Sequence, residues 1–191
     1  LQATVEMTQA QTLPDSRDRI AEMLAAGIQD VTNAMVESFK LNEVLRMILE
    51  TMYRALNFRR VVFCLRDAKS ETLVGRLGLG ENVENEAKLI RVPLKLAPGQ
   101  LPDLFSAVCL KGVDTLIADT GAQKIAERLP SWQAQLNAGS FLILPMQMKG
   151  APFAMIYADK PRAGSIDLDE KELAMLRTLR NQAVMAFRQM S

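Results

Sequence analysis

The chain has 191 residues, 49% of them hydrophobic, and its 23 basic and 22 acidic residues leave a net charge of +1. This length and apolar content suit one well-buried domain with some helix to spare, and the balanced charge argues against nucleic acid or an anionic membrane as the main partner. The chain has no histidine, which excludes His-based acid–base catalysis, His-coordinated metals and His-ligated haem, so we expect neither a metal nor a cofactor.

Residues 1–14 show no periodicity, and we expect a disordered arm or linker there. The sequence has no signal peptide and no apolar run of about 18 residues, so we expect a cytoplasmic protein. Because the chain begins at Leu1 rather than Met and finishes inside a helical pattern, we expect it to be a piece of something longer.

Two helices are predicted next. Residues 15–40 form the first, behind a cap at Asp15 or Ser16, because apolar residues recur at steps of three and four: Ile20, Leu24, Ile28, Val31, Met35 and Phe39. A second helix follows Asn42, has a similar apolar face, and ends at Asn57.

The next segment is rich in strand-forming residues. RRVVFCLRD (59–67) and TLVGRLGLG (72–80) predict two strands joined by a hairpin loop. The glycines of GRLGLG do not have the spacing of a phosphate-binding loop, and we interpret them as strand-end and turn residues. Acidic residues 81–88 predict a solvated loop, and residues 89–96 predict a short strand interrupted by Pro93.

An insertion with short elements follows. We expect a helix over 103–112 closed by Gly112, a brief strand over 114–119, and one or two short helices within 122–136, which carry the only tryptophan, Trp132.

FLILPMQMKGAPFAMIYADK (141–160) is the most informative segment, because two apolar runs flank a Lys149-Gly150 turn and predict a hairpin. The hairpin hardly alternates polar with apolar residues, so we expect both of its faces to be covered. A capping box of Asp169 and Glu172 then starts a helix that reaches about residue 190. We interpret the arginines of this helix as a solvated face, with interhelical pairing as the alternative.

This order of elements predicts an α+β domain. An antiparallel sheet of five or six strands carries the N- and C-terminal helices on one face and the helical insertion on the other. Asp119 closes a strand and Trp132 lies in the insertion, so both are candidate ligand contacts; turn capping and core packing are the alternatives.

The two cysteines, Cys64 and Cys109, each stand among apolar neighbours and lack C-x-x-C spacing. We interpret them as buried structural thiols, with a redox pair as the alternative.

The chain resembles the GAF domain, a sensory and regulatory module of many signalling proteins. The resemblance rests on the helix LNEVLRMILETMYRAL leading into RRVVFCLRD, on the strand DTLIAD, and above all on GSFLILPMQMKGAPFAMIYADK followed by a long helix. It covers about residues 40–190, and we take 41–191 as the GAF-like domain. Two helical segments, AAGIQDVTNAMVESFKLNEVLRMILETMYRAL and KELAMLRTLRNQAVMAFRQM, further resemble the carboxy-terminal, GAF-like part of bacterial HDOD signalling proteins.

The resemblance implies a six-stranded antiparallel sheet, terminal helices that often mediate dimerisation, and a ligand cleft under the insertion. On family geometry, the residues that line the cleft are Phe105, Asp119, Trp132, Ser140 and Tyr157. The sequence lacks the histidines of bilin- and haem-binding members and the signature of cyclic-nucleotide-binding members, so their ligands are not implied.

We therefore expect a non-catalytic sensory or regulatory module of a bacterial signalling protein. It would bind an unidentified small molecule, form a homodimer through helices 16–40 and 169–190, and act on a preceding HDOD-like domain. One alternative is a thiol-based reductase, similar to the methionine sulfoxide reductase branch of the family, that uses Cys64 and Cys109. The other is a ligand-free dimerisation scaffold whose cleft is filled by side chains.

Overall fold

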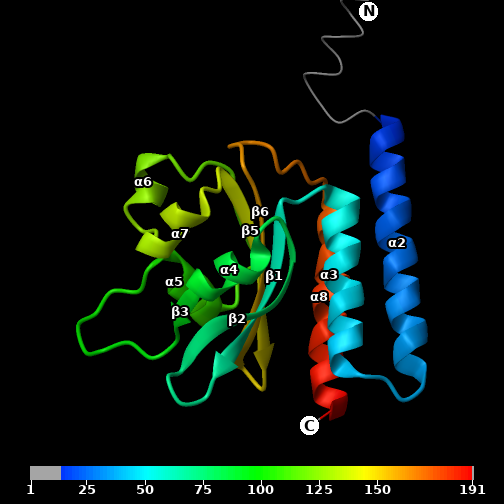
Figure 1. Ribbon diagram of the computed structural model, residues 1–191, viewed down its shortest axis with the longest axis horizontal. Helices are drawn as coiled ribbons and strands as arrows, with labels where there is room; N and C mark the ends of the chain where they lie inside the picture. The colour runs from blue at the N-terminus through cyan, green and yellow to red at the C-terminus, as the bar shows by residue number, and fades with distance from the viewer. Residues whose placement is uncertain (1–13, 191) are drawn as a thin grey trace, which may run out of the picture.

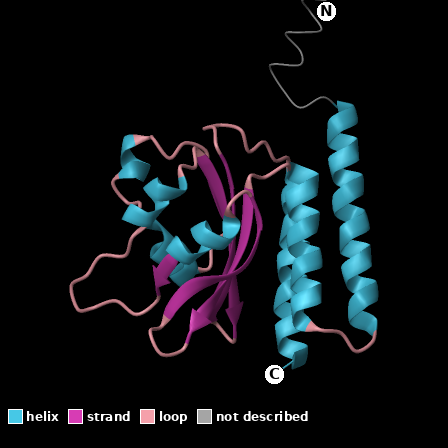
Figure 2. Cartoon of the chain, viewed as in Figure 1, coloured by secondary structure: helices cyan, strands magenta, loops and turns pink. Residues whose placement is uncertain are grey.

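The computed structural model describes residues 14–190. Of the arm expected over residues 1–14, residues 1–13 lie outside the described part, as does residue 191, and Pro14 is the first residue of a helix. The described residues contain a six-stranded sheet whose strand order is β3-β2-β1-β6-β5-β4, with antiparallel neighbours throughout (Figures 1 and 2). The strands are β1 (Arg60–Asp67), β2 (Thr72–Gly80), β3 (Arg91–Pro93), β4 (Thr115–Ile117), β5 (Ser140–Met148) and β6 (Ala151–Lys160).

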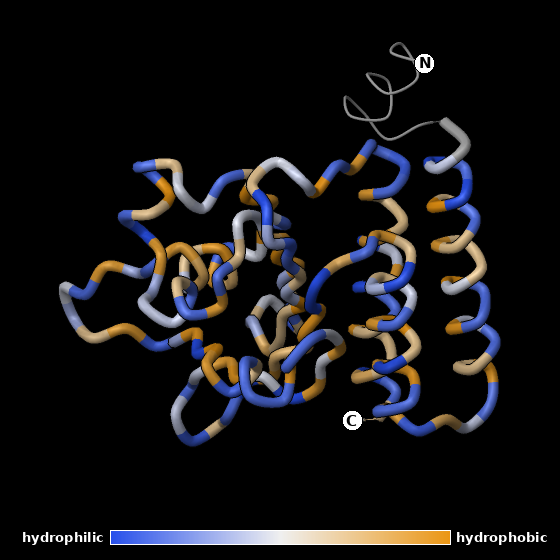
Figure 3. The backbone as a smooth tube through the Cα atoms, turned by 45° about the horizontal axis from the view of Figure 1, so that its top comes forward, coloured by the Kyte–Doolittle hydropathy of each residue, from blue (hydrophilic) through white to orange (hydrophobic). Residues whose placement is uncertain are grey.

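Long helices cover one face of the sheet: α2 (Pro14–Val36), α3 (Leu41–Leu56) and α8 (Glu170–Met190). Figure 1 shows α3 and α8 beside the sheet and α2 outside them. The apolar stripe of α2 faces inward onto α3 and α8 (Figure 3), and its Leu24 and Val31 are fully buried. The stripe predicted on this helix therefore has its partners within the same chain.

Helix ends follow local chemistry closely. The Asp169–Glu172 capping box is confirmed, because Asp169 Oδ1 accepts the Glu172 N–H at 2.7 Å and Glu172 Oε1 accepts the Asp169 N–H at 3.0 Å. Asn57 ends α3 in the left-handed conformation. By contrast, α2 begins at Pro14 and stops at Val36, so the prediction that this helix runs to residue 40 was too long.

The β5–β6 hairpin is confirmed and is covered on both faces. Leu142, Leu144 and Ile156 pack in the helix-side core, whereas Phe141, Ile143, Met155 and Tyr157 pack in a second core under the insertion. The two layers explain why the hairpin sequence does not alternate.

The insertion side carries short helices: α4 (Val83–Glu86), the 3₁₀ helix η1 (Ala87–Leu89), α5 (Leu104–Lys111), α6 (Gln123–Ala126) and α7 (Ser131–Leu136). The loop predicted over 81–88 is thus wrong, and only Arg91–Pro93 of the predicted 89–96 strand is extended.

Glycines explain where α4 and η1 lie. A Cβ added at Gly75 would lie 2.4 Å from the Ala87 carbonyl oxygen, and one at Gly78 would lie 2.6 Å from a Val83 methyl. Gly75 and Gly78 let the α4–η1 segment lie directly on β2, so interpreting these two as strand-end or turn residues was wrong, whereas Gly80 ends β2 as predicted.

Candidate functional site

An aromatic cluster lies between the hairpin and the insertion. The ring of Phe105 on α5 lies 4.6 Å from Trp132, 5.0 Å from Phe141 and 6.1 Å from Tyr157, measured between ring centroids. All four residues are buried, and Trp132 Nε1 donates to the Arg91 carbonyl oxygen at 2.9 Å. The structure thus brings together Phe105, Trp132 and Tyr157 from the predicted lining set.

The other two predicted residues lie outside this cluster. Asp119 is exposed, and its Oδ1 accepts the Gly121 N–H at 2.8 Å, which caps a turn. Ser140 is buried at the start of β5 and donates to the Arg162 carbonyl oxygen at 2.9 Å. The segments that hold them adjoin, because the Thr120 N–H donates to the Gly139 carbonyl oxygen at 3.0 Å.

A buried charged network borders the aromatic cluster. Tyr157 donates its hydroxyl to Asp159 Oδ2 at 2.6 Å, and Arg60 Nη2 donates to the same oxygen at 2.8 Å. Arg60 also contacts the Glu86 carboxylate and the Leu136 carbonyl oxygen. Burial, together with the negative charge of Asp159, raises the pKa of Tyr157 well above its ordinary value.

Sequence reasoning missed this network. Its partners are far apart along the chain, but one signal was available. Arg60 opens an apolar strand and Asp159 closes another, and charged residues are seldom fully buried unless paired.

A polar pocket of about 260 Å³ opens beside the network. It is lined by residues from the start of β1, from α4 and the turn before it, and from the end of α7. These residues are Arg59, Arg60, Glu81, Asn82, Glu86, Gln135, Leu136 and Asn137. Two guanidinium groups, carboxylates and amides therefore meet next to the aromatic cluster.

The two cysteines lie in the insertion-side core. Burial, followed by the charge of Asp103, raises the pKa of Cys109 to about 12, and burial raises the pKa of Cys64 further. Cys109 Sγ lies 3.7 Å from the Met155 sulfur. Because the thiolate is the nucleophile in cysteine chemistry, both thiols are in an environment that suppresses reactivity.

Asp114, which links α5 to β4, joins the insertion to α8. Its Oδ1 lies 2.5 Å from Arg180 Nη1, and its Oδ2 lies 3.2 Å from Arg180 Nη2 and 2.9 Å from Arg177 Nε. Arg180 also donates to the Pro145 carbonyl oxygen of β5 at 2.9 Å. The interpretation as a solvated face was wrong for Arg180, whose side chain is 14% exposed, whereas Arg177 is exposed and still pairs with Asp114. We call this set of contacts the Asp114 clamp.

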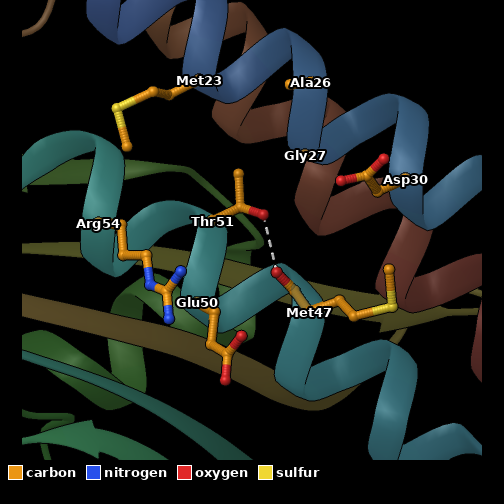
Figure 4. Close-up of a pocket in the computed structure, with 8 residues that line it drawn as sticks. All are labelled: Met23, Ala26, Gly27, Asp30, Met47, Glu50, Thr51 and Arg54. Carbon is orange, nitrogen blue, oxygen red and sulfur yellow. Dashed lines mark hydrogen bonds between the residues drawn. The ribbon is translucent and has the colours of Figure 1, made fainter.

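A further pocket, of about 290 Å³, follows the seam between α2 and α3 (Figure 4). It is lined by Met23, Ala26, Gly27 and Asp30 from α2 and by Met47, Glu50, Thr51 and Arg54 from α3. Figure 4 shows the side chains of Met23 and Met47 on opposite sides of Thr51, and the acidic and basic groups belong to Asp30, Glu50 and Arg54.

Neither a metal cluster nor a membrane span is present in the described residues. Across 14–190, no three His, Cys, Asp or Glu side chains are grouped to hold a metal ion. In the same residues, no helix combines the length and apolar content needed to cross a membrane.

The model of the GAF domain family matches residues 40–187. The chain belongs to the GAF domain family. No relative was found among curated proteins. The family assignment confirms the predicted α+β architecture, with its six-stranded antiparallel sheet and flanking helices.

Several solved structures are similar to this chain. The GAF domain of a phosphoenolpyruvate-protein phosphotransferase from Coxiella burnetii has a TM-score of 0.68 at 16% identity, covering 88% of this chain and 95% of that chain. A methyl-accepting chemotaxis protein, residues 122 to 287, has a TM-score of 0.62 at 22% identity, covering 87% and 95%. Free methionine-R-sulfoxide reductase from Neisseria meningitidis has a TM-score of 0.67 at 17% identity, covering 95% and 96%. At these identities the likeness establishes the fold alone.

Proposed function

We propose that this GAF domain is a non-catalytic regulatory module that senses a small molecule under the insertion and passes its state to α8. The Asp114 clamp is the observation that carries the proposal. The insertion contacts the aromatic cluster through α5, and two arginines of α8 hold the residue that follows α5 at hydrogen-bonding distance. A change in the insertion layer therefore has a direct mechanical path to the last helix.

The proposed ligand lies between the hairpin and the insertion, against Phe105, Trp132 and Tyr157. Aromatic side chains favour a flat or apolar body, and the adjoining pocket with Arg59 and Arg60 suits a polar end. We keep Asp119 and Ser140 in the proposal as residues of the two adjoining segments at the edge of this layer.

Trp132 supplies the test, because it is the only tryptophan and its emission reports on the cluster. Small molecules that copurify should be released on denaturation, identified by mass spectrometry and titrated back against Trp132 emission. Phe105→Leu should weaken the binding of such a molecule, whereas Phe58→Leu, a buried control in the helix-side core, should not. Equal affinity in both variants would contradict the proposed site.

Dimerisation is a second part of the proposal. Met23 of α2 is 38% exposed and lines the pocket along the α2–α3 seam. Methionine adapts well to apolar partners. We propose a homodimer in which α2 and α8 of one copy meet those of another.

Light scattering should show a dimer that Met23→Asp weakens. Val113→Asp, a change at an exposed apolar residue beside β4, is the control and should not weaken it. A monomer at high micromolar concentration would contradict it.

We further propose that the module acts on a preceding HDOD domain. This rests on the likeness of the flanking helices to those of HDOD signalling proteins. Coexpression of the chain with a separate HDOD domain should give a complex; migration as independent species would count against it.

Two other functions are supported by specific observations. The fold likeness to the Neisseria meningitidis reductase is the reason to test a thiol reductase. The burial of Cys64 and Cys109 argues against this function. Neither thiol should react with a disulfide reagent in the native protein; rapid titration of both would favour the reductase. The ring-to-ring packing of Phe105 favours a ligand-free scaffold, which the Trp132 titration also tests.

A further inference from the structure

A separate pocket of about 510 Å³ lies at the tip of the β5–β6 hairpin. We call it the hairpin pocket; it is lined by Arg66, Met148, Lys149, Ala151, Pro152, Phe153 and Arg188. It shares no residue with the aromatic cluster. Figure 1 shows the hairpin tip and the carboxyl end of α8 at the same end of the molecule. Its volume lies in the range of small-molecule sites, about 300–1,000 Å³.

A β-bulge supplies the aromatic wall of this pocket. Met146 pairs with Ala154 and Gln147 pairs with Pro152, so Phe153 has no partner across the hairpin. A bulge re-aims the side chain that it carries. The Phe153 ring packs edge-on against Phe187 of α8, with centroids 5.2 Å apart, and lies partly buried against the helix-side core. The bulge thereby places an aromatic ring where the hairpin meets α8.

The charge of the pocket lining is one-sided. Three of its residues, Arg66, Lys149 and Arg188, are cationic, and none is acidic. Arg66 lies 3.5 Å from Glu71, but both side chains are about 40% exposed, and such a pair neutralises little of the local field. Cations beside an apolar wall favour a ligand that has both an anionic group and an apolar body.

Lys149 occupies a backbone position that does not suit it. Its φ is 54° and that of Gly150 is 77°, the two positive values of a type I′ turn. Asn is favoured over Lys at the first of these positions. A long cationic side chain therefore sits at the pocket at some cost in backbone energy, and backbone strain of this kind clusters at functional sites.

We propose that the hairpin pocket binds a small organic anion with an apolar body, such as an acyl or aryl carboxylate. The anionic group is held by Lys149 and Arg66, and the body lies against Phe153 and Met148. A bound ligand joins the hairpin tip to the last turns of α8. This site is independent of the sensory function proposed above, and failure of either leaves the other standing.

Anilinonaphthalene sulfonate is a suitable probe, because it combines aromatic rings with one anionic group. Fluorescence titration of the intact chain should show binding that octanoate displaces. Octanol has the apolar body without the anionic group, and inorganic phosphate has the anionic group without the apolar body. Each should displace the probe at least tenfold less effectively than octanoate. Displacement by either one as effectively as by octanoate would overturn the proposed ligand class.

Lys149→Asn separates binding from folding, because it removes the charge while relieving the turn. We expect the probe to bind about two- to fivefold more weakly, as for the loss of one partly exposed ion pair, with thermal stability unchanged or raised. Lys124→Asn on α6 is the charge-matched control and should leave binding unchanged. Equal affinity in the two variants would overturn the proposal.

The position of the probe is the second measurement. Amide NMR shifts on adding octanoate should centre on Lys149, Gly150 and Phe153, and Phe153→Leu should reduce them. Shifts centred instead on Trp132 would show that the anion enters the aromatic cluster and would overturn the hairpin pocket as its site.

Discussion

Gly27 sets how closely α2 approaches α3. A Cβ at this position would lie 2.2 Å from the Thr51 methyl and 2.8 Å from Thr51 Cβ, too close for any side chain. Thr51 cannot turn away freely, because its hydroxyl donates to the Met47 carbonyl oxygen at 2.8 Å (Figure 4). The absence of a side chain at Gly27 therefore allows α2 to approach α3 closely at Thr51.

Gly27→Ala should lower the free energy of unfolding by about 1–3 kcal/mol, the usual cost of overpacking. Helix propensity alone predicts the opposite sign, a gain of up to about 1 kcal/mol. Urea denaturation measures the difference, and Ala25→Gly on the exposed side of α2 calibrates the propensity effect. A more stable Gly27→Ala protein would show that α2 does not pack against Thr51 in this way.

Buried side chains with raised pKa values should lower the stability of the fold at alkaline pH. The pKa values of Tyr157, Cys64 and Cys109 are all raised in the folded protein, chiefly by burial. Above the unfolded pKa values, about 8.5 for Cys and about 10 for Tyr, the unfolded chain holds fewer protons than the folded one. Stability is therefore fully present below about pH 8.5 and falls as the pH rises.

Denaturant unfolding between about pH 8 and pH 11 should show this fall, at up to about 1.4 kcal/mol per pH unit for each titrating group. Tyr157→Phe should flatten the curve above about pH 10, although it lowers stability at neutral pH through loss of the bond to Asp159. Tyr53→Phe, at the only other tyrosine, is the control. An unchanged slope in Tyr157→Phe would refute the assignment.

At the scale of elements, strand β2 and the α4–η1 segment depend on each other. The backbone of Ala87 lies against Gly75, and the segment closes with an N–H···O bond from Ile90 to Ala87 at 3.2 Å. The segment also supplies Glu86 to buried Arg60. It is therefore one wall of the pocket beside the aromatic cluster.

Gly75→Ala should displace this segment, because a methyl group cannot occupy the space next to a carbonyl oxygen. We expect faster amide hydrogen exchange at Ile90 and a loss of about 1–3 kcal/mol. Arg76→Ala, at the neighbouring exposed position, should change neither. Unchanged exchange at Ile90 in Gly75→Ala would mean that the contact is not maintained in solution.

Sequence patterns predicted the elements whose signals are local. The apolar stripes marked α2, α3 and α8, the Lys149-Gly150 turn marked the hairpin, and the Asp169–Glu172 box marked the start of α8. α4 was missed because ENVENEAK has no apolar period. Its position depends on two glycines of another element, and a contact of that kind leaves no local signal.

The candidate site was predictable only in part, for the same reason. Family geometry brought Phe105, Trp132 and Tyr157 together, since each lies on an element of predictable position. The Arg60–Asp159 pair and the Asp114–Arg180 pair join residues 99 and 66 positions apart, and one sequence carries no signal for such pairings. These polar contacts are what connect the cluster to the rest of the fold.

At the scale of the whole molecule, the sheet separates two cores. The helical layer lies on one face and the insertion on the other, and the central strands belong to both cores. The Asp114 clamp connects the two sides through Asp114, just before β4, and through the Pro145 carbonyl oxygen of β5. A regulatory module needs such a connection, since a change on the insertion side must reach α8.

Hydrogen exchange of α8 in four proteins tests this connection most directly: wild type, Phe105→Leu, Asp114→Asn and the double variant. Phe105→Leu loosens the aromatic cluster on the side of the sheet away from α8. We expect it to increase exchange of α8 amides around Arg177 and Arg180 severalfold when Asp114 is present, and to have little further effect in the Asp114→Asn background. An increase of the same size in both backgrounds, or no change in α8 at all, would contradict the account.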